Sequence, residues 1–177
     1  MAKFEFVEKY KDCGLPLPAR ATKNAAGYDL YVAEDTVVPS LFSMRNDLID
    51  SHGLFDRMEL KEVETLTKTL ATRPTLVSTG VKCKLDDNQY LEITVRSSTP
   101  LKYWLICANG QGIIDADYYQ NPSNDGEIFL QLFNLLPTDI LLRKGDKIGQ
   151  GIIKTYGITE DDIADKDRKG GFGSTNQ

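Results

Sequence analysis

Alternation of apolar and polar residues dominates two parts of the chain, one before residue 40 and one after residue 74. A period of two is typical of strands that are buried on one face, and turn-forming residues separate these short runs. We expect strands in the following segments: 4–7, 28–32, 36–38, 77–81, 90–95, 103–108, 128–133 and 147–156. Short strands at regular spacing predict a mainly β fold, either a sandwich or a jelly roll.

Between residues 40 and 73 the pattern changes to that of helices. Apolar residues recur three or four positions apart, and Gly53 divides the segment in two. Glu64 and Lys68 form an i, i+4 pair that suits the outer face of the second helix. We predict two helices here, in a segment that either decorates the surface of the β fold or binds a protein partner.

The end of the chain, residues 165–177, is rich in glycine and carries no predicted helix. A Walker-type phosphate loop leads into a helix whose N-terminus faces the phosphates, so this end does not fit that motif. We expect a flexible C-terminal arm that orders on a ligand, the alternative being a frayed terminus. By length, residues 1–177 are predicted to form one domain.

Composition narrows the class of protein. The chain is 41% hydrophobic and 27% charged, no apolar run approaches the ~20 residues of a membrane span, and the start has no signal-peptide pattern, so we expect a cytoplasmic protein without a membrane partner. The net charge of −5 disfavours binding to nucleic acid. Three widely spaced cysteines favour buried thiols over disulfides or a zinc site. A single histidine excludes a Ser-His-Asp triad within one chain and any multi-histidine metal centre, which leaves carboxylates for proton transfer.

Residues 109–119 are predicted to form a tight hairpin that carries chemistry. Gly110 and Gly112 allow positive φ and the close approach of a ligand to the backbone. Residues two apart in a strand face the same side, so Asp115 and Asp117 would flank one concave surface. The alternative is a hairpin with solvated acids on its rim.

Four further segments share an order and spacing with this hairpin: 26–30 (AGYDL), 95–98 (VRSS), 145–150 (GDKIGQ) and 168–175 (RKGGFGST). Together the five resemble the ordered motifs of the trimeric dUTP diphosphatases (dUTPases), with residues 40–73 as an insertion that would suit a bacterial or phage protein. The resemblance implies a distorted jelly-roll β-barrel and a homotrimer whose active sites are shared between chains. It also implies hydrolysis of dUTP to dUMP and pyrophosphate, which limits uracil incorporation into DNA and supplies dUMP for thymidylate synthesis.

The resemblance also assigns the catalytic chemistry. Asp115 would orient and deprotonate the water that attacks the α-phosphate, as a general base. Mg²⁺ would be held by triphosphate oxygens and water rather than by direct protein ligands, with Asp29 and Gln150 next to its waters. This agrees with magnesium's tendency to retain waters. Taken alone, Asp29 is an ordinary solvated or turn-side acid.

Phosphate binding is assigned to two segments. Arg96 and Ser97, followed by Ser98, resemble the motif for the α- and β-phosphates, although Arg96 alone is equally compatible with a structural ion pair. The C-terminal arm would close over the β- and γ-phosphates, and its aromatic residue would stack on the base. The residues expected to bind substrate there are Arg168, Gly171, Phe172, Gly173 and Ser174.

Selection of base and sugar is assigned to the hairpin. Asn109, with hairpin groups at Gly112 and Ile114, would hydrogen-bond uracil, and Asp117 would lie at the substrate. Tyr118 matches the aromatic that packs under the deoxyribose and excludes a 2′-hydroxyl. The alternative for Tyr118 is core packing with its hydroxyl at the edge.

Two departures from the family pattern leave alternatives open. Val95 and Ser98 replace the family's usual proline and glycine, and residues 119–125 lengthen the loop after the motif tyrosine. Arg-Ser-Ser also resembles the related dCTP deaminases, but these depend on a glutamate where this chain has Gln131, which cannot shuttle a proton. A further alternative is a regulatory protein that uses the 40–73 insertion as its contact surface.

Overall fold

Antiparallel strands make up most of the structure, a computed structural model that describes residues 1–42, 73–166, 168, 170 and 171. The strands are β1 (Lys3–Phe6), β2 (Tyr28–Tyr31), β3 (Thr36–Val38), β4 (Thr75–Ser78), β5 (Val81–Lys84), β6 (Gln89–Val95), β7 (Leu105–Cys107), β8 (Gly112–Asp115), β9 (Phe129–Asn134), β10 (Ile140–Leu142) and β11 (Lys147–Thr155). The short helical elements between these strands include η1 (Glu8–Tyr10), α3 (Ser98–Tyr103) and η2 (Ala116–Tyr118). The predicted mainly β, jelly-roll-like fold is therefore confirmed.

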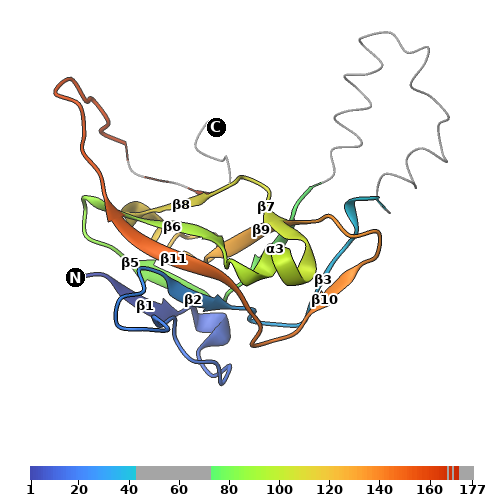
Figure 1. The fold of residues 1–177 in the computed structure, drawn as a ribbon. Coiled ribbons are helices and arrows are strands. Elements are labelled where there is room, and N and C mark those ends of the chain that lie inside the picture. Colours follow the sequence, from blue (N-terminus) through green and yellow to red (C-terminus); the bar gives the residue numbers. More distant parts are fainter. Residues whose placement is uncertain (43–72, 167, 169, 172–177) are drawn as a thin grey trace, which may run out of the picture.

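Two larger sheets position the residues of interest. One has the strand order β2-β11-β6-β8 and the other the order β4-β9-β7, while β1 pairs with β5 and β10 with β3. Figure 1 shows β8, β6, β11 and β2 following one another across the molecule, with α3 at the end of β6. Gly149 lets the sheets approach closely, because a Cβ there would lie 2.6 Å from Cδ2 of Leu130 on β9.

The core lies between these sheets and consists of aliphatic side chains from both. Leu30, Leu91, Leu130 and Ile148 are completely buried, and each contributes to the hydrophobic stabilisation of the fold. Strand β9 shows how alternation produces this arrangement, because every second residue from Leu130 is buried and the residues between are only half-buried. The half-buried side chains of β9, which include Gln131, therefore face away from the core.

The predicted hairpin is wrong in its pairing. The turn at 108–111 joins β7 to β8, but β7 pairs with β9 and β8 pairs with β6, so it links two sheets. Gly110 has φ +70°, as expected, whereas Gly112 is required for a different reason. A Cβ on Gly112 would lie 2.5 Å from Cγ1 of Ile93 on the neighbouring strand.

The segment after β6 also differs from the prediction. A turn near Pro100 and a strand from Tyr103 were expected, but α3 occupies 98–103 and β7 begins at Leu105. Proline is tolerated in the first turn of a helix, and Trp104 ends this one with φ 52°. Thr99 is buried, and its hydroxyl donates to the carbonyl of Ile148 at 2.9 Å. This bond fixes α3 to β11.

The two helices predicted within 40–73 fall almost entirely outside the described residues. Among the cysteines, Cys83 is buried and Cys13 and Cys107 are partly buried, all three as free thiols, in agreement with the prediction. No helix in the described parts of the chain is long and apolar enough to cross a membrane.

Candidate functional site

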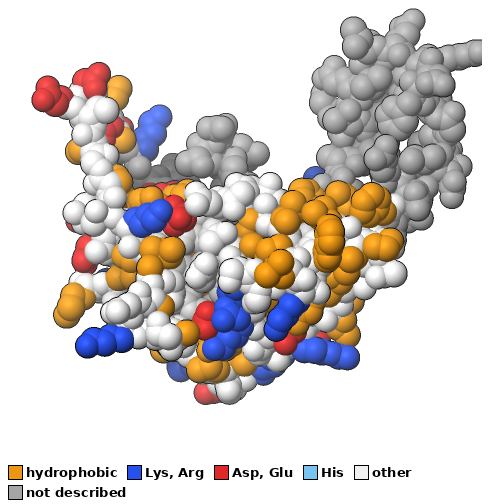
Figure 2. Space-filling view, in the orientation of Figure 1, with side chains coloured by type: hydrophobic (Ala, Val, Ile, Leu, Met, Phe, Trp, Pro, Cys, Tyr) orange, Lys and Arg blue, Asp and Glu red, His pale blue; other side chains and the backbone are white. Residues whose placement is uncertain are grey.

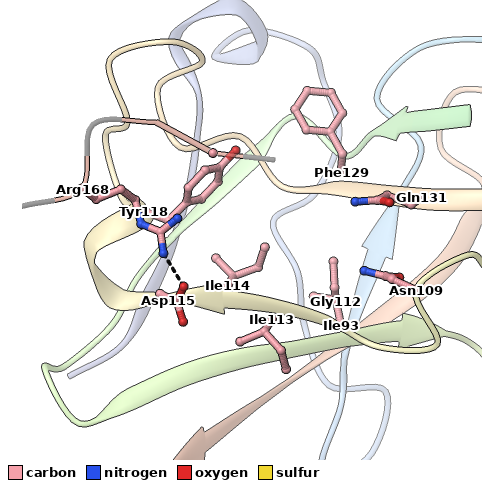
Figure 3. Close-up of a pocket in the computed structure, with 11 residues that line it drawn as sticks. Ile93, Asn109, Gly112, Ile113, Ile114, Asp115, Tyr118, Phe129, Gln131 and Arg168 are labelled. Carbon is pink, nitrogen blue, oxygen red and sulfur yellow. Dashed lines mark hydrogen bonds and ion pairs between the residues drawn. The ribbon is translucent and has the colours of Figure 1, made fainter. Parts of the chain in front are cut away.

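A cavity of about 180 Å³ opens between β6, β8 and β9, close to the C-terminal arm (Figure 3). It is lined by Ile93, Asn109, Gly112, Ile113, Ile114, Asp115, Tyr118, Phe129, Gln131, Arg168 and Gly171. The structure thus brings together seven of the predicted site residues: Asn109, Gly112, Ile114, Asp115, Tyr118, Arg168 and Gly171. One end of the cavity is charged and the other carries side-chain amides, with aliphatic residues between them.

The charged end is formed by Asp115 and Arg168. The Arg168 guanidinium donates from Nη2 to Asp115 and from Nε to Asp117, the latter at 2.7 Å. The two acids do not share a strand face as predicted, because Asp115 ends β8 and Asp117 lies in η2. They converge instead through the arginine that contacts both.

This pairing leaves the carboxylates accessible. The side chains of Asp115 and Asp117 are 51% and 56% exposed, whereas that of Arg168 is 19% exposed. Ion pairs with exposed partners contribute little stability, so Arg168 can exchange Asp115 for another anion at small cost. Asp115 is therefore placed to face a polar ligand in the cavity.

Tyr118 forms a wall of the cavity and is held at its hydroxyl. The hydroxyl donates to the backbone carbonyl of Glu127 at 3.2 Å and accepts from Nδ2 of Asn124 at 2.6 Å. Burial raises the pKa of this phenol, so it stays neutral. Arg168 lies 5.9 Å from the ring centroid, and a Cβ on Gly171 would lie 2.7 Å from Cε2 of the ring. The arm therefore packs on Tyr118 at a position that only glycine fits without a shift.

The loop behind Tyr118 contains a buried acid that sequence reasoning did not single out. Glu127 accepts hydrogen bonds from the hydroxyl of Ser78 and from the backbone N–H of Gly80. Burial raises its pKa above the ordinary value. The same loop is anchored by Asp125, which accepts from Lys82 at 2.7 Å. These contacts hold the lengthened 119–127 loop against β4 and β5.

Arg96 lies in a second cluster, built on a buried carboxylate. Asp29 on β2 is paired with Nε of Arg96 at 2.9 Å and with Nζ of Lys147 at 3.0 Å. The hydrogen bond to Asp29 raises the pKa of Lys147 above its ordinary value. The structure therefore contains the ion pair that the sequence offered as the alternative for Arg96. The contact with Lys147 was not predicted, because it depends on the neighbouring positions of β2 and β11.

The other predicted residues of this cluster lie on the same sheet or at the start of α3. Gln150 on β11 lies opposite Asp29 on β2 and opposite Thr94 on β6. Its side chain packs on Gly27, where a Cβ would lie 2.5 Å from Oε1 of Gln150. Ser97 is the N-cap residue of α3 and makes no side-chain capping bond, and α3 begins at Ser98.

The two clusters are far apart within one chain. Asp115 lies opposite Tyr90 on β6, and Arg96 follows six residues later (96 − 90), just past the end of the strand. At about 3.3 Å per residue the separation is on the order of 20 Å. We refer to Asn109, Asp115, Tyr118 and Arg168 as the Asp115 half-site and to Asp29, Arg96, Ser97, Lys147 and Gln150 as the Arg96 half-site.

Some predicted site residues are not described by the structure, and some observed ones were missed. Phe172, Gly173 and Ser174 lie outside the described residues. Gln131 and Phe129 line the cavity but were not predicted as substrate contacts, although their half-buried alternation on β9 could have marked them. Within the described residues, no group of three or more His, Cys, Asp or Glu side chains could hold a metal ion.

Comparison with known proteins places the chain among nucleotide hydrolases. The family model described as dUTPase matches residues 59–176. The deoxyuridine 5'-triphosphate nucleotidohydrolase of Lactococcus lactis subsp. lactis strain IL1403 is 32% identical over 174 residues, covering 97% of this chain and 95% of that protein. The protein of the same name from Rickettsia typhi is 30% identical over 175 residues, covering 96% of this chain and 94% of its own length.

Solved structures agree with these relatives. The dUTPase from Streptococcus mutans has a TM-score of 0.68 and 32% identity, covering 89% of this chain and 98% of its own. The dUTPase from phage phi11 of S. aureus has a TM-score of 0.61 at 16% identity, covering 98% of this chain and 99% of its own, which is a likeness of fold.

Proposed function

The chain belongs to the dUTPase family, and on that premise we propose that it hydrolyses dUTP to dUMP and pyrophosphate. Relatives that share about a third of its residues over nearly its whole length are named deoxyuridine 5'-triphosphate nucleotidohydrolases. The observation that carries the proposal is the cavity that ends on Asp115, with Asn109 and Tyr118 in its walls. This arrangement suits a nucleoside whose base is enclosed and whose phosphates leave past an acid.

Asp115 would act as the general base. Its carboxylate is half exposed and lies at the mouth of the cavity, where a water between it and an α-phosphate could be deprotonated. Arg168, now paired with it, would move onto phosphate oxygens, which are stronger anionic partners for a guanidinium. Asp117 would take part by keeping one end of Arg168 nearby.

Binding of base and sugar would use the inner part of the cavity. Asn109 with the backbone of Gly112 and Ile114 would hydrogen-bond the uracil edge, and Tyr118 would pack under the deoxyribose. The hydroxyl of Tyr118 is already bound to Asn124 and to the Glu127 carbonyl, so the ring cannot turn aside for a 2′-hydroxyl.

Phosphate binding would combine the Arg96 half-site with the arm. Arg96 uses Nε for Asp29, which leaves its terminal nitrogens for phosphate, and Ser97 and Ser98 lie at the start of α3. The arm would close over the outer phosphates through Arg168 and Gly171. Phe172, Gly173 and Ser174, which lie outside the described residues, stay predictions for that closure.

Mg²⁺ would be held by the triphosphate and by water. The described residues offer no group of three or more direct ligands, and the two exposed carboxylates beside the cavity, Asp115 and Asp117, share Arg168, so the triphosphate would supply the ligands. Asp29 and Gln150 lie side by side on paired strands and would face the water shell of the ion. When bound, the ion would neutralise charge that develops on the phosphate oxygens.

Shared sites in a homotrimer would reconcile the two half-sites. An attacking water and the phosphate it attacks must lie within a few ångströms of each other, whereas Asp115 and Arg96 of one chain are about 20 Å apart. A second chain must therefore supply Arg96 to the Asp115 half-site. Figure 2 shows apolar side chains gathered on the side that carries α3. Exposed apolar residues of α3 and its neighbours, which suit burial between chains, are Leu101, Trp104, Ile106, Val37 and Leu141.

The activity is tested by measuring pyrophosphate release from dUTP, dCTP, dTTP and UTP in parallel. We expect turnover of dUTP and little of the other three. Turnover of dCTP in preference to dUTP, or of none of the four, would refute the proposal. The insertion at 40–73 as a protein contact and the cytoplasmic location both stay predictions from the sequence.

Site sharing is tested by mixing inactive variants. Asp115→Asn and Arg96→Ala chains should each be nearly inactive alone and regain activity when dissociated together and reassembled, because some mixed sites then contain both native residues. Sedimentation should show a trimer. Absence of recovery in mixtures that sediment as trimers would place both residues in one chain's site.

A further inference from the structure

Gln131 lies beside the residue assigned to base recognition. Its backbone carbonyl accepts a hydrogen bond from the N–H of Ala108 at 2.8 Å, and Asn109 is the next residue in the chain. On its other side Gln131 pairs with Leu76 of β4. Since both neighbouring strands hold its backbone, its side chain is directed to the outer face of β9, into the cavity.

The amide of Gln131 is available to a ligand. Figure 3 shows the side chains of Asn109 and Gln131 at the same end of the cavity, opposite the end with Asp115 and Arg168, and both amides are directed into the cavity. Within the described part of the chain, neither side-chain amide is hydrogen-bonded to another residue. Asn109 is exposed and Gln131 is half-buried, and no amide atom of Gln131 is both fully buried and unpaired. Both amides are therefore accessible to a ligand.

The apolar side chains around the Asn109 and Gln131 amides increase the effect that these amides can have on base selection. Ile93 and Ile114 present apolar side chains to the cavity, so Asn109 and Gln131 supply the amide side chains of its lining beside the hairpin backbone. A polar edge enclosed among apolar side chains costs free energy unless it is paired, and hydrogen bonds in such a place discriminate strongly.

We propose that Gln131, together with Asn109, reads the polar edge of the base and so helps to select uracil over cytosine. This inference rests on the proposed function, since it concerns the base of the same nucleotide. Uracil presents a carbonyl oxygen at C4 and an N–H at N3, whereas cytosine presents an amino group and an unprotonated nitrogen. The Gln131 amide donates to the C4 carbonyl, and the Asn109 carbonyl accepts from N3–H.

Replacing the amide by a carboxylate tests this assignment. Gln131→Glu keeps the length and shape of the side chain but removes its donor, so the variant opposes an acceptor oxygen of uracil and suits the amino group of cytosine. We expect kcat/KM for dUTP to fall on the order of tenfold or more, and the ratio of dUTP to dCTP turnover to fall further. Calorimetry should show a lower affinity for dUMP and a higher affinity for dCMP than in the wild type.

Two further variants complete the experiment. Gln89→Glu is the matched control, because Gln89 lies outside the cavity lining and uses only its carbonyl oxygen, as acceptor from Asp86 N–H. Its base preference should equal that of the wild type. Gln131→Met removes both donor and acceptor, and it should weaken dUMP binding without improving that of dCMP.

The outcomes separate the two proposals. Wild-type protein that releases no pyrophosphate from dUTP would refute the proposed function. Active wild type with an unchanged dUTP to dCTP ratio in Gln131→Glu would refute the role of Gln131 alone. If Gln131→Glu does not fold, Gln131→Met decides, and unchanged dUMP affinity there would overturn the inference.

Discussion

The two half-sites differ in how their acids are held. In the Arg96 half-site Asp29 is 8% exposed and contacts two cations, from β11 and from the end of β6. In the Asp115 half-site two half-exposed acids share one arginine of the C-terminal arm. The first arrangement is fixed by three strands of one sheet, and the second depends on a segment beyond the last strand. Charge in the first cluster therefore holds neighbouring strands together, while the exposed charges of the second can change partners at small cost.

The difference bears on catalysis. A phosphate-binding arginine benefits from being positioned in advance, because a fixed dipole or charge needs no reorganisation during the reaction. A general base must instead be exposed to water and released from its ion pair when the substrate arrives. Under the proposed roles of Arg96 and Asp115, these two requirements would fall to different half-sites.

The largest effect on turnover is expected from replacing Asp115, the proposed general base. Asp115→Asn keeps the shape and a hydrogen bond to Arg168 but removes the proton acceptor, so kcat should fall by ~10²- to 10⁴-fold. Binding of dUTP should be retained, which equilibrium titration can check. A variant with near-normal turnover would show that another group activates the water.

Deletion of the arm from Lys166 onwards should separate activity from stability. The deletion removes Arg168 and the packing of Gly171 on Tyr118, so turnover should fall on the order of a hundredfold. The melting temperature should hardly change, because the arm's ion pairs have half-exposed partners. Unfolding of the truncated protein would instead make the arm a structural element.

Much of this contrast was not predictable from the sequence. Alternation identified most strands, but the predicted strand 77–81 was wrong because it spans the turn between β4 and β5, and β10 was not predicted. The five motifs identified most of the cavity lining. The pairing of Asp29 with Arg96 and Lys147 could not be read from the chain, because it depends on the strand order β2-β11-β6. Asp117 was misplaced because a 3₁₀ turn, which no periodicity marks, begins directly after Asp115.

Short or non-periodic elements account for the other errors. The six-residue α3 contains Pro100 and too few turns to show a helical pattern. Gln131 was considered only as the absence of a catalytic glutamate, although its place on the half-buried face of β9 directs it into the cavity. Sequence motifs locate what a family shares, and the packing of neighbouring strands locates the rest.

The contrast in burial predicts unequal stability effects for two matched substitutions. Asp29→Asn leaves Arg96 and Lys147 without their common partner and should lower stability by about 1–3 kcal/mol. For a chain of this size that is a fall in melting temperature of roughly 2–4 °C per kcal/mol. Asp117→Asn should change the melting temperature by less than about 1 °C, because the Asp117 side chain is 56% exposed. Equal effects in thermal unfolding would remove the distinction between the half-sites.

The smallest effect on stability is expected for Glu127, the buried acid in the loop behind Tyr118. Burial raises the pKa of Glu127 above its ordinary value, so the folded state binds this proton more tightly than the unfolded state. That contribution to stability is fully present below the unfolded pKa of 4.5 and is lost as pH rises through the folded pKa. Glu127→Gln should therefore melt above the wild type at pH 7, and the difference should be lost below the unfolded pKa. Asp125→Asn is the control of opposite sign, because its hydrogen bond from Lys82 lowers the pKa of Asp125. That variant should be less stable than the wild type at pH 7 and match it only at pH values below the folded pKa. Melting curves in which both variants shift alike at every pH would show that their effects come from packing rather than from charge.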